Sequence, residues 1–298
     1  MEYNGLEDVV CGLCDLRQEE FLFKDNGFNL VRCRNCGLVY VNPRPKDAPQ
    51  AEDAGHFKEY LKGMTGRTIE AKKILGEITK KAKAGKILDI GCAAGYFLKA
   101  ARAEGWTVKG VERSRMFCDY AKDEFGLDVF CGTLESADLK DGLFDVITML
   151  DVLSHLRSPK RTLSLANRAL RQGGLLVIKT GNKGELGRKK LGETFGVSWN
   201  TPEHLCHFSK KALKILLEKT NFNIEKIDIT ANVSNIISPK NIGVDKSAPM
   251  SSLAEECKRY IYPAYRLARA AIDLSFGKIL PMFVTMDSTV VVYAKKRS

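Results

Sequence analysis

The sequence predicts an α/β protein with a parallel sheet covered by helices on both faces, preceded by a small cysteine-containing module. Two observations carry this prediction. From Lys86 onward, short apolar patterns typical of strands alternate with helical patterns, as in a parallel sheet with both faces covered. Before residue 45, two Cys-x-x-Cys pairs stand beside short β-like segments. A chain of 298 residues is long enough for one full α/β domain and such a module.

The N-terminal part contains two expected strands, Phe28–Arg32 and Leu38–Val41, and ends in the stiff segment Asn42–Pro45. The residues that follow are charged and have a helical pattern. Three parts are therefore expected: a ribbon-like module over residues 1–45, a helical connector over 46–84 and the α/β domain over 85–298.

Within the α/β domain, apolar runs predict strands at Lys86–Ile90, Thr107–Val111, Asp128–Cys131, Phe144–Met149 and Leu175–Thr180. Helices are expected to begin near Tyr96, Met116 and Pro159, with a further helix over Lys210–Thr220. A late pair of strands, Ile224–Thr230 and Thr289–Ala294, brackets a long insertion at about residues 238–284.

Composition indicates a cytoplasmic protein with reduced thiols. No apolar run reaches the roughly 18 to 20 residues of a spanning helix, and the first eight residues are acidic where a signal peptide would be basic and then apolar. Four of the nine cysteines sit in pairs, and the other five are scattered singly along the chain. Such scatter fits free thiols better than a disulfide framework.

The formal net charge of +11 is open to two interpretations. Lysine and arginine release counterions when they neutralise phosphates, so the charge suits nucleic acid, an anionic membrane surface or a phosphorylated substrate. Alternatively, lysines simply solvate helix faces, as expected at Lys72 and Lys73, Lys80 and Lys81, and Lys210 and Lys211. Composition alone leaves both interpretations open.

Four cysteines have the spacing of a metal site, namely Cys11, Cys14, Cys33 and Cys36. Tetrahedral Zn²⁺ takes four soft ligands, and each Cys-x-x-Cys turn places two thiolates on one ion. Gly12 and Gly37 are expected to give the two turns their conformational freedom. A redox pair would instead be single and would lie at a helix N-terminus. Four thiolates leave no open position for water, so the predicted zinc is structural.

A second motif joins the strand Ile87–Ile90 to a helix through the small-residue loop Gly91–Gly95. The loop lets the backbone approach a ligand at the carboxyl end of the sheet. A dinucleotide fingerprint, G-x-G-x-x-G, is not met when counted from Gly91. Asp89 would repel a pyrophosphate but can receive an ammonium group, directly or through the loop. These features predict a cationic cofactor, with Asp89, Gly91, Cys92 and Gly95 among its binding residues.

Glu112 stands at the tip of the second strand, about 20 residues past the glycine loop, where its two oxygens can accept both hydroxyls of a ribose. The alternative is a solvated surface acid. We favour ribose binding because of the position at a strand end. Nicotinamide enzymes share this feature, so Asp89 rather than Glu112 discriminates between cofactor classes.

Five segments resemble, in order and spacing, the motifs of class I S-adenosylmethionine-dependent methyltransferases. They are Ile87–Leu98 (motif I), Val111–Ser114 (ribose), Gly132–Glu135 (adenine), Phe144–Leu156 (fourth strand) and Leu170–Ile178 (the turn before strand five). The resemblance covers residues from about 85 to 230, and again the closing strand Ser288–Lys295.

This resemblance implies a Rossmann-like sheet of seven strands, mostly parallel with an antiparallel last strand, and S-adenosylmethionine as cofactor. It also adds to the cofactor-binding residues Leu134, Glu135, Asp151 and His155. Two departures from the family pattern stand beside His155. Ser154 replaces the acid that usually precedes it, and Arg157–Pro159 replaces an acidic turn.

Two further segments, Arg32–Tyr40 and Pro202–Ser209, are similar to the subset of these enzymes that carry a zinc-binding head. That subset often acts on sugars or other metabolites of cell-envelope and natural-product pathways. The resemblance therefore implies a small acceptor, carbohydrate or nucleotide-linked.

Transfer of a methyl group to a weak hydroxyl or carbon acid also requires a base, and histidine is the usual base near neutral pH. The pair Glu203 and His204 resembles an acid and histidine pair of sugar carbon-methyltransferases, which would make His204 the base and Glu203 its partner or a substrate ligand. His207 is the third candidate. The alternative is that Asn200–Ser209 merely caps the next helix, with Ser209 as N-cap and His207 packed beneath it.

The insertion contains the basic and partly aromatic segment Lys258–Ile272. Three roles compete for it: a lid over the acceptor, a surface helix that touches anionic lipid, and a dimer contact. A lid is favoured because insertions before the last strand lie at the rim of the cofactor cleft.

The sequence thus predicts an S-adenosylmethionine-dependent methyltransferase acting on a small acceptor. One alternative is an rRNA or tRNA methyltransferase that grips RNA with its zinc module, but residues 1–46 hold six basic against seven acidic residues. Another is a non-catalytic cofactor-binding scaffold, which would show a damaged cofactor loop. The acceptor atom, the oligomeric state and the identity of any base stay open.

Overall fold

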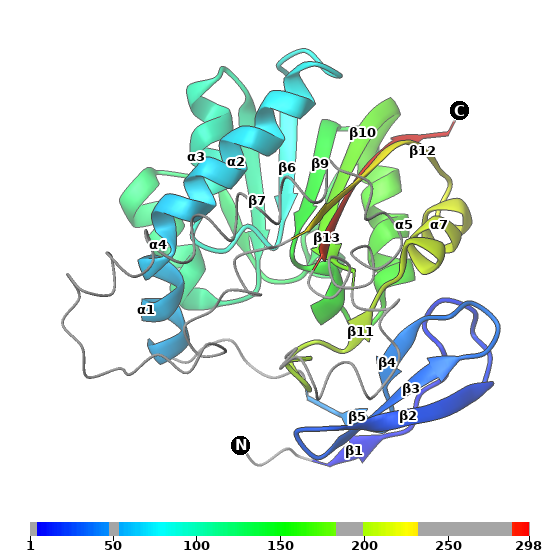
Figure 1. Cartoon of the computed structure of the whole chain (residues 1–298). Coiled ribbons are helices and arrows are strands. Elements are labelled where there is room, and N and C mark those ends of the chain that lie inside the picture. Colours follow the sequence, from blue (N-terminus) through cyan, green and yellow to red (C-terminus); the bar gives the residue numbers. More distant parts are fainter. Residues whose placement is uncertain (1–4, 48–53, 183–198, 232–287, 298) are drawn as a thin grey trace, which may run out of the picture. The chain divides into compact units, whose positions relative to one another are not determined.

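The computed structural model describes residues 5–47, 54–182, 199–231 and 288–297 (Figure 1). The chain divides into two compact units, one of Met1–Asp228 with Val290–Ser298 and the other of Ile229–Thr289. All the contacts below belong to the first unit. The predicted insertion at 238–284, with its basic segment, lies outside the described residues.

A seven-stranded sheet runs through the described part of the first unit. Its strands are β6 (Lys86–Ile90), β7 (Thr107–Glu112), β8 (Val129–Cys131), β9 (Phe144–Leu150), β10 (Leu170–Gly181), β12 (Phe222–Ala231) and β13 (Ser288–Lys296). Their order is β12-β13-β10-β9-β6-β7-β8. The four pairings from β10 to β8 are parallel, and the last strand is antiparallel. The predicted fold class is confirmed.

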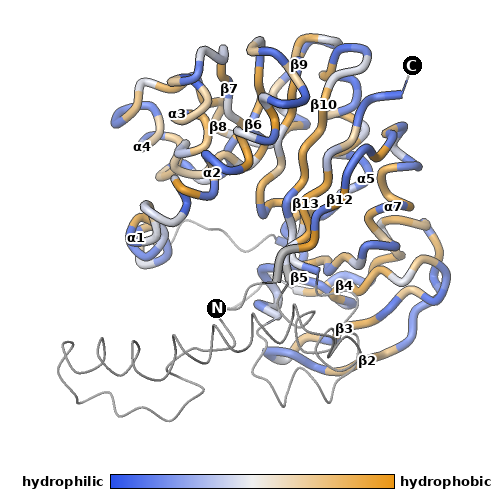
Figure 2. The backbone as a smooth tube through the Cα atoms, turned by 45° about the horizontal axis from the view of Figure 1, so that its top comes forward, coloured by the Kyte–Doolittle hydropathy of each residue, from blue (hydrophilic) through white to orange (hydrophobic). Residues whose placement is uncertain are grey.

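Separate sets of helices bury the two faces of this sheet (Figure 1). One face carries α2 (Met64–Thr79), α3 (Tyr96–Ala103) and α4 (Arg115–Phe125), and the other carries α5 (Pro159–Ala169) and α7 (Lys210–Lys219). Neighbouring residues of β6 point to opposite faces, so Ile87 joins the first core and Leu88 the second. Because both faces are covered, the middle of an inner strand is apolar without alternation, as in the buried run Leu175–Ile178 of β10 (Figure 2).

The structure confirms the expected strands and helices of this sheet, with one clear difference at β10. That strand begins at Leu170, five residues before its predicted start at Leu175. Leu170 already pairs with Phe144 of β9, and the register then shifts before Leu175 pairs with Val146. An irregular start of this kind has no periodic pattern in the sequence, so the prediction missed it.

The N-terminal head contains a two-stranded pair and a four-stranded sheet. The strands are β1 (Leu6–Glu7), β2 (Glu19–Asp25), β3 (Phe28–Cys33), β4 (Val39–Val41), β5 (Arg44–Pro45) and β11 (Cys206–His207). The larger sheet has the order β11-β4-β3-β2, and β1 pairs with β5. The hairpin between β2 and β3 turns at Asn26 and Gly27, whose φ angles are 49° and 84°, as an Asn-Gly turn requires.

Strand β11 lies more than 150 positions after β4 in the sequence, yet it forms an edge of the head's sheet. Ion pairs and hydrogen bonds also join the head to the α/β domain. Arg157 forms an ion pair with Glu7 and donates a hydrogen bond to the carbonyl of Pro45 at 2.9 Å. Lys160 pairs with Asp15. The basic turn that departs from the family pattern at Arg157–Pro159 therefore faces the acidic residues of the head.

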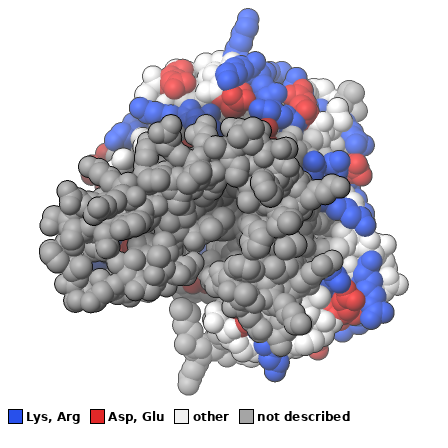
Figure 3. All heavy atoms as spheres, in the orientation of Figure 1, with Lys and Arg blue, Asp and Glu red and all other residues white. Residues whose placement is uncertain are grey.

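Charges of both signs are interspersed on the described surface visible in Figure 3. Many of the basic residues are paired with a neighbouring acid, including Lys80 with Glu77, Lys109 with Asp128 and Arg168 with Asp141. Part of the positive charge is thus balanced locally. Among the described helices, none has both the length and the apolar character needed to cross a membrane.

Candidate functional site

The four predicted cysteine ligands meet in one place. The sulfur atoms of Cys11, Cys14, Cys33 and Cys36 all lie within 4.8 Å of one another, and those of Cys11 and Cys36 are 3.5 Å apart. Tetrahedral zinc with Zn–S bonds of about 2.3 Å needs sulfurs about 3.8 Å apart. The four thiols therefore have the arrangement that a single ion requires.

Equivalent residues shape the two turns of this cluster. Asp15 and Gly37 each follow the second cysteine of a pair, and their φ angles are 61° and 76°. Their backbone N–H groups donate to the carbonyls of Cys11 and Cys33 at 2.8 and 2.9 Å. Gly37 thus has the role expected of it, but the expectation for Gly12 was wrong, because the left-handed residue of the first turn is Asp15.

The cofactor-type loop at the end of β6 depends on its two glycines. Gly91 has a φ of 73°, and a Cβ atom there would lie 2.6 Å from the side chain of Val152. Gly95 has a φ of 80° and is the N-cap of α3, where a Cβ would meet Leu127 at 2.5 Å. No larger residue fits at either position without a shift of its surroundings. The two glycines therefore let the loop pack closely against Val152 and Leu127.

Asp89 lies in β6, two residues before the start of this loop, and its side chain is 3% exposed. One carboxylate oxygen accepts a hydrogen bond from the hydroxyl of Thr148 at 2.6 Å. Burial raises the pKa of Asp89 to about 7, and the nearby negative charge of Glu112 adds to this effect. A buried carboxylate that is costly to ionise gains most from a cationic ligand. Its surroundings therefore fit the predicted ammonium group.

Glu112 ends β7, the neighbour of β6 in the sheet. Its two carboxylate oxygens accept hydrogen bonds from the backbone N–H groups of Ala93 and Ser114, both at 2.9 Å. The carboxylate thus ties the glycine loop to the start of α4. Each oxygen retains acceptor capacity for a further donor, such as a ribose hydroxyl.

Sequence reasoning missed an aromatic group beside these two acids. Tyr60 of α1 (Ala54–Lys62) stacks on Tyr96 with ring centroids 6.5 Å apart, and the guanidinium of Arg67 lies 3.7 Å from the Tyr60 ring. Burial raises the pKa of Tyr60 to about 12, and the charges of Asp89 and Glu112 contribute. The expected helical connector therefore lies near the candidate cofactor residues, although its pattern signalled only a charged helix.

Three other predicted cofactor residues are buried or bonded within the fold. Cys92 is buried against Gly110, and Leu134 is buried at the start of the short helix η1 (Leu134–Ser136). Glu135 accepts a hydrogen bond from the hydroxyl of Thr162 on α5 at 3.0 Å. Their roles toward a cofactor remain predictions.

Asp151, the next predicted residue, follows β9 with a φ of 59°. Its carboxylate accepts from the ammonium of Lys179 at 2.5 Å, and Glu70 of α2 accepts from the same ammonium at 2.8 Å. Burial would lower the pKa of Lys179, but the two carboxylates outweigh it and raise the pKa. The motif pattern did not single out Lys179 or Glu70, because only packing brings α2 to the end of β10.

The three histidines of interest form one cluster. The His155 and His204 ring centroids are 4.5 Å apart at 89°, and those of His204 and His207 are 6.0 Å apart. The Nδ1 atom of His155 is 3.0 Å from the carbonyl oxygen of Glu203. His207 is buried, whereas the side chain of Glu203 is exposed. The structure thus brings His155, Glu203, His204 and His207 together from two segments about 50 residues apart in sequence.

Helix capping is also present at this place. The hydroxyl of Ser209 accepts a hydrogen bond from the backbone of Ala212 at 3.1 Å and is the N-cap of α7. His207 is buried two residues earlier. Because the cap uses Ser209, the capping interpretation and a role for His204 are compatible.

Residues 61–227 match the model of a family described as a methyltransferase domain. The match covers more than half of the 298 residues. The chain belongs to this family. The family expected from the motifs is therefore confirmed, and the glycine loop, the acids of β6 and β7 and the histidine cluster are all parts of a methyltransferase fold.

Curated relatives of the methyltransferase domain differ in their named substrates. A ubiquinone biosynthesis O-methyltransferase of Coxiella burnetii is 29% identical over 120 residues, which are 39% of this chain and 50% of that protein. A tRNA U34 carboxymethyltransferase of Syntrophotalea carbinolica is 37% identical over 102 residues, 32% of each chain. This chain thus spans half or less of the length of these relatives.

A chain in the complex between the Haloferax volcanii Trm112 methyltransferase activator and a methyltransferase has a similar fold. Its TM-score is 0.54 at 16% identity, over 85% of this chain and 100% of that one. At this identity the likeness shows the fold alone.

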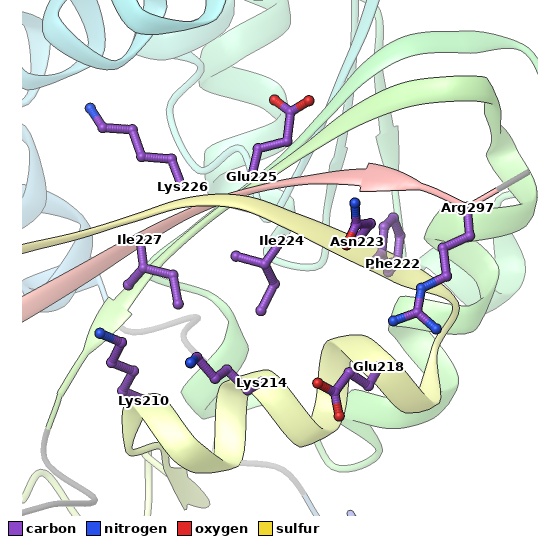
Figure 4. Close-up of a pocket in the computed structure, with 10 residues that line it drawn as sticks. All are labelled: Lys210, Lys214, Glu218, Phe222, Asn223, Ile224, Glu225, Lys226, Ile227 and Arg297. Carbon is purple, nitrogen blue, oxygen red and sulfur yellow. The ribbon is translucent and has the colours of Figure 1, made fainter.

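A separate hollow of about 450 Å³ lies between α7 and β12 (Figure 4). Ile224 and Ile227 point from β12 toward the helix, and Lys210 and Lys214 line the helix side. None of the predicted cofactor, metal or histidine residues lines it. It is therefore distinct from the candidate site.

Proposed function

We propose that this protein is an S-adenosylmethionine-dependent methyltransferase that acts on a small acceptor, carbohydrate or nucleotide-linked. The observation that carries the proposal is the pair of acids, Asp89 and Glu112, at the ends of adjacent parallel strands around a glycine loop. The carboxyl ends of such strands are where ligands bind in open α/β sheets.

Each acid has its own task in this proposal. The carboxylate of Asp89 would receive the ammonium of the cofactor, and Glu112 would accept the ribose hydroxyls, while the glycine loop gives the backbone close access. When bound, the cofactor supplies an electrophilic methyl group on a sulfonium. A non-catalytic scaffold would be expected to have a damaged cofactor loop, and the loop of this protein is intact.

The histidine cluster would serve the acceptor. We propose His204 as the base that takes a proton from the acceptor's nucleophilic atom, with Glu203 as its partner or as a ligand of the acceptor. His155 and His207 flank His204 and restrict its orientation. A single histidine base contributes on the order of a hundredfold or more to such a rate.

The ion in the head is proposed to be Zn²⁺ with a structural role. Four thiolates complete its tetrahedron, so no position is left for water or substrate. The soft donor set favours zinc over magnesium or calcium. A cytoplasmic location and contact of the basic insertion with an anionic membrane are kept as proposals from sequence alone.

The alternative acceptor is RNA, because one curated relative is named for a tRNA substrate. The interspersed charges of the described surface favour the small acceptor. Incubating the protein with methyl-labelled cofactor should label a pool of nucleotide sugars and leave total RNA unlabelled. Labelled RNA, together with RNA affinity that falls steeply with salt, would establish the alternative instead.

The proposed base is tested by His204→Ala. We expect the methyl-transfer rate to fall about a hundredfold, because no other group would take the acceptor's proton as readily. Cofactor affinity, measured by calorimetry, should stay unchanged, since Asp89 and Glu112 are untouched. Lys211→Ala, at an exposed position of the helix that follows His204, is the control. An unchanged rate in His204→Ala would reject this role.

A further inference from the structure

The segment of residues 199–209 carries the candidate histidines, and we refer to it as the histidine loop. Its first attachment to the head is through the backbone. In β11, Cys206 pairs with Tyr40 and His207 with Val39, both of β4. The N–H of Val41 also donates to the carbonyl of Leu205 at 3.0 Å. The residues around His204 are thus an edge strand of the metal-binding head.

The second attachment is at the tip of the β2–β3 hairpin. The side-chain amide of Asn26 donates to the carbonyl of Thr201 at 2.9 Å, and the N–H of Thr201 donates to the carboxylate of Asp25 at 3.2 Å. Both backbone polar groups of Thr201 are therefore satisfied by two adjacent head residues. Thr201 stands three positions before His204. The two hydrogen bonds therefore hold the backbone of the histidine loop close to His204.

The third attachment is aromatic. The ring of Trp199 lies 5.1 Å from Phe23 of β2 at 62° and 4.8 Å from His207 at 83°, measured between centroids. All three side chains are buried. Edge-to-face contacts of this kind favour one relative orientation of the rings. Phe23 of the head is thus linked to His207 of the cluster through the ring of Trp199.

On its other side the histidine loop is held by the short helix η2 (Leu153–His155), which follows β9. The N–H of Leu205 donates to the carbonyl of Ser154 at 2.8 Å. His155 contacts the carbonyl of Glu203. The loop therefore lies between the head and the end of the parallel sheet, and both must be in place to define the position of His204.

We propose that the metal-binding head is the element that positions the acceptor-side histidines, with Asp25 and Asn26 as its positioning residues. The role of His204 in transfer rests on the proposed function, but the coupling of head and loop does not. The four-thiolate cluster stabilises the ribbon from which the β2–β3 hairpin and β4 extend. Metal in the head is therefore required for an ordered histidine loop, and cofactor binding is not expected to depend on it.

The test uses substitutions in the hairpin tip of the full chain. Asn26→Gly removes the amide but accepts the left-handed φ of that position, and Asp25→Ala removes the acceptor. Asp25→Asn keeps an acceptor oxygen and should restore most of the lost function. Lys24→Ala, at an exposed position of the same strand, is the matched control.

In Asn26→Gly and Asp25→Ala we expect amide hydrogen exchange in residues 199–208 to accelerate about tenfold. The turnover number should fall about tenfold or more, because a small misplacement of a catalytic group is costly. Cofactor affinity should stay within about twofold of wild type. Exchange and turnover like those of Lys24→Ala would overturn the proposal, as would an equal loss of cofactor affinity.

Removal of the metal gives a second readout that needs no turnover. After treatment with a chelator, exchange in residues 199–208 should accelerate while calorimetry still shows cofactor binding. Protection of the loop that survives metal loss would overturn the proposal. The failure of this proposal can be told from the failure of the proposed function. If the hairpin variants loosen the histidine loop but His204→Ala keeps full activity, His204 is not the base, and the coupling of the head to the loop is still supported.

Discussion

Asp89 is the residue whose surroundings say most about the ligand of this site. It is almost fully buried, it has one hydroxyl partner in Thr148, and its nearest acid, Glu112, raises its pKa further. Water, which would normally stabilise its charge, is excluded. A cationic ligand would supply that stabilisation, whereas a pyrophosphate would add repulsion. The surroundings of Asp89 therefore favour a cationic cofactor.

The raised pKa of Asp89 has a measurable consequence. In the free protein this pKa is about 7, and a bound cation must lower it, so binding releases a proton from any protein that is still protonated. Affinity for S-adenosylmethionine should therefore rise as the pH increases from about 6 to about 8, by up to tenfold per pH unit below the pKa. Above the pKa it should level off.

Calorimetry across this pH range checks the prediction, and Asp89→Asn should bind weakly with a flat profile. Thr148→Ala is a useful companion, because the hydroxyl of Thr148 lowers the pKa of Asp89 and its loss should move the rise to higher pH. A wild-type affinity that does not vary between about pH 6 and 8 would show that Asp89 does not titrate on binding.

At the scale of elements, helices α1 and α2 bring the expected connector near the candidate cofactor residues. α2 has four buried residues against the sheet, namely Ala71, Ile74, Leu75 and Ile78. α1 has no fully buried residue. Ring contacts hold α1 near the sheet: Phe57 and Tyr60 contact Phe117 of α4, and Tyr60 also stacks on Tyr96 of α3. An element without a fully buried residue can adjust to a ligand more readily than the helices of the core.

Tyr60→Ala should weaken S-adenosylmethionine binding about tenfold, because it removes the ring beside Asp89 and Glu112 and the stacking surface of Arg67. Tyr60→Phe should bind like wild type, since the ring is kept. Lys58→Ala, at an exposed position of the same helix, serves as control. Equilibrium binding decides the matter, and wild-type affinity in Tyr60→Ala would remove α1 from the cofactor site.

At the scale of the whole molecule, the head and the parallel sheet belong to one compact unit. β11 completes the sheet of the head, the turn at Arg157 pairs with Glu7, and Lys219 of α7 donates to the carbonyl of Leu13 at 3.2 Å. The buried cluster that contains Cys11 and Leu13 also contains the inner residues of α5 and α7. Loss of order in the head should therefore be felt on the face of the sheet that α5 and α7 cover, whereas Cys92 and Ala94 of the glycine loop belong to the core on the other face.

Cys33→Ser should abolish binding of the one ion expected per chain and lower the melting temperature, because a structural metal contributes its binding energy to folding. Atomic absorption gives the metal content, and thermal unfolding gives the stability. Cys131→Ser changes a half-buried thiol of β8 outside the cluster and should keep the metal. A full complement of zinc in Cys33→Ser would contradict the four-thiolate site.

Local pattern determined the strands and helices of the sheet, the four-cysteine cluster and the position of Asp89 just before the glycine loop. Each depends on the spacing of neighbouring residues: the period of burial, the two-residue gap of a metal turn, the small residues after a strand. These constraints act within a few positions of the chain and can be read without its fold.

Tertiary structure alone decided that β11 joins the head, that Tyr60 reaches the two acids, and that Asp25 and Asn26 hold Thr201. The bond from Asn26 to Thr201 joins residues 175 positions apart. Contacts over such separations depend on how whole elements pack, and no periodicity or local spacing records them. The sequence therefore determined which groups are present for the chemistry, and packing decided which of them meet.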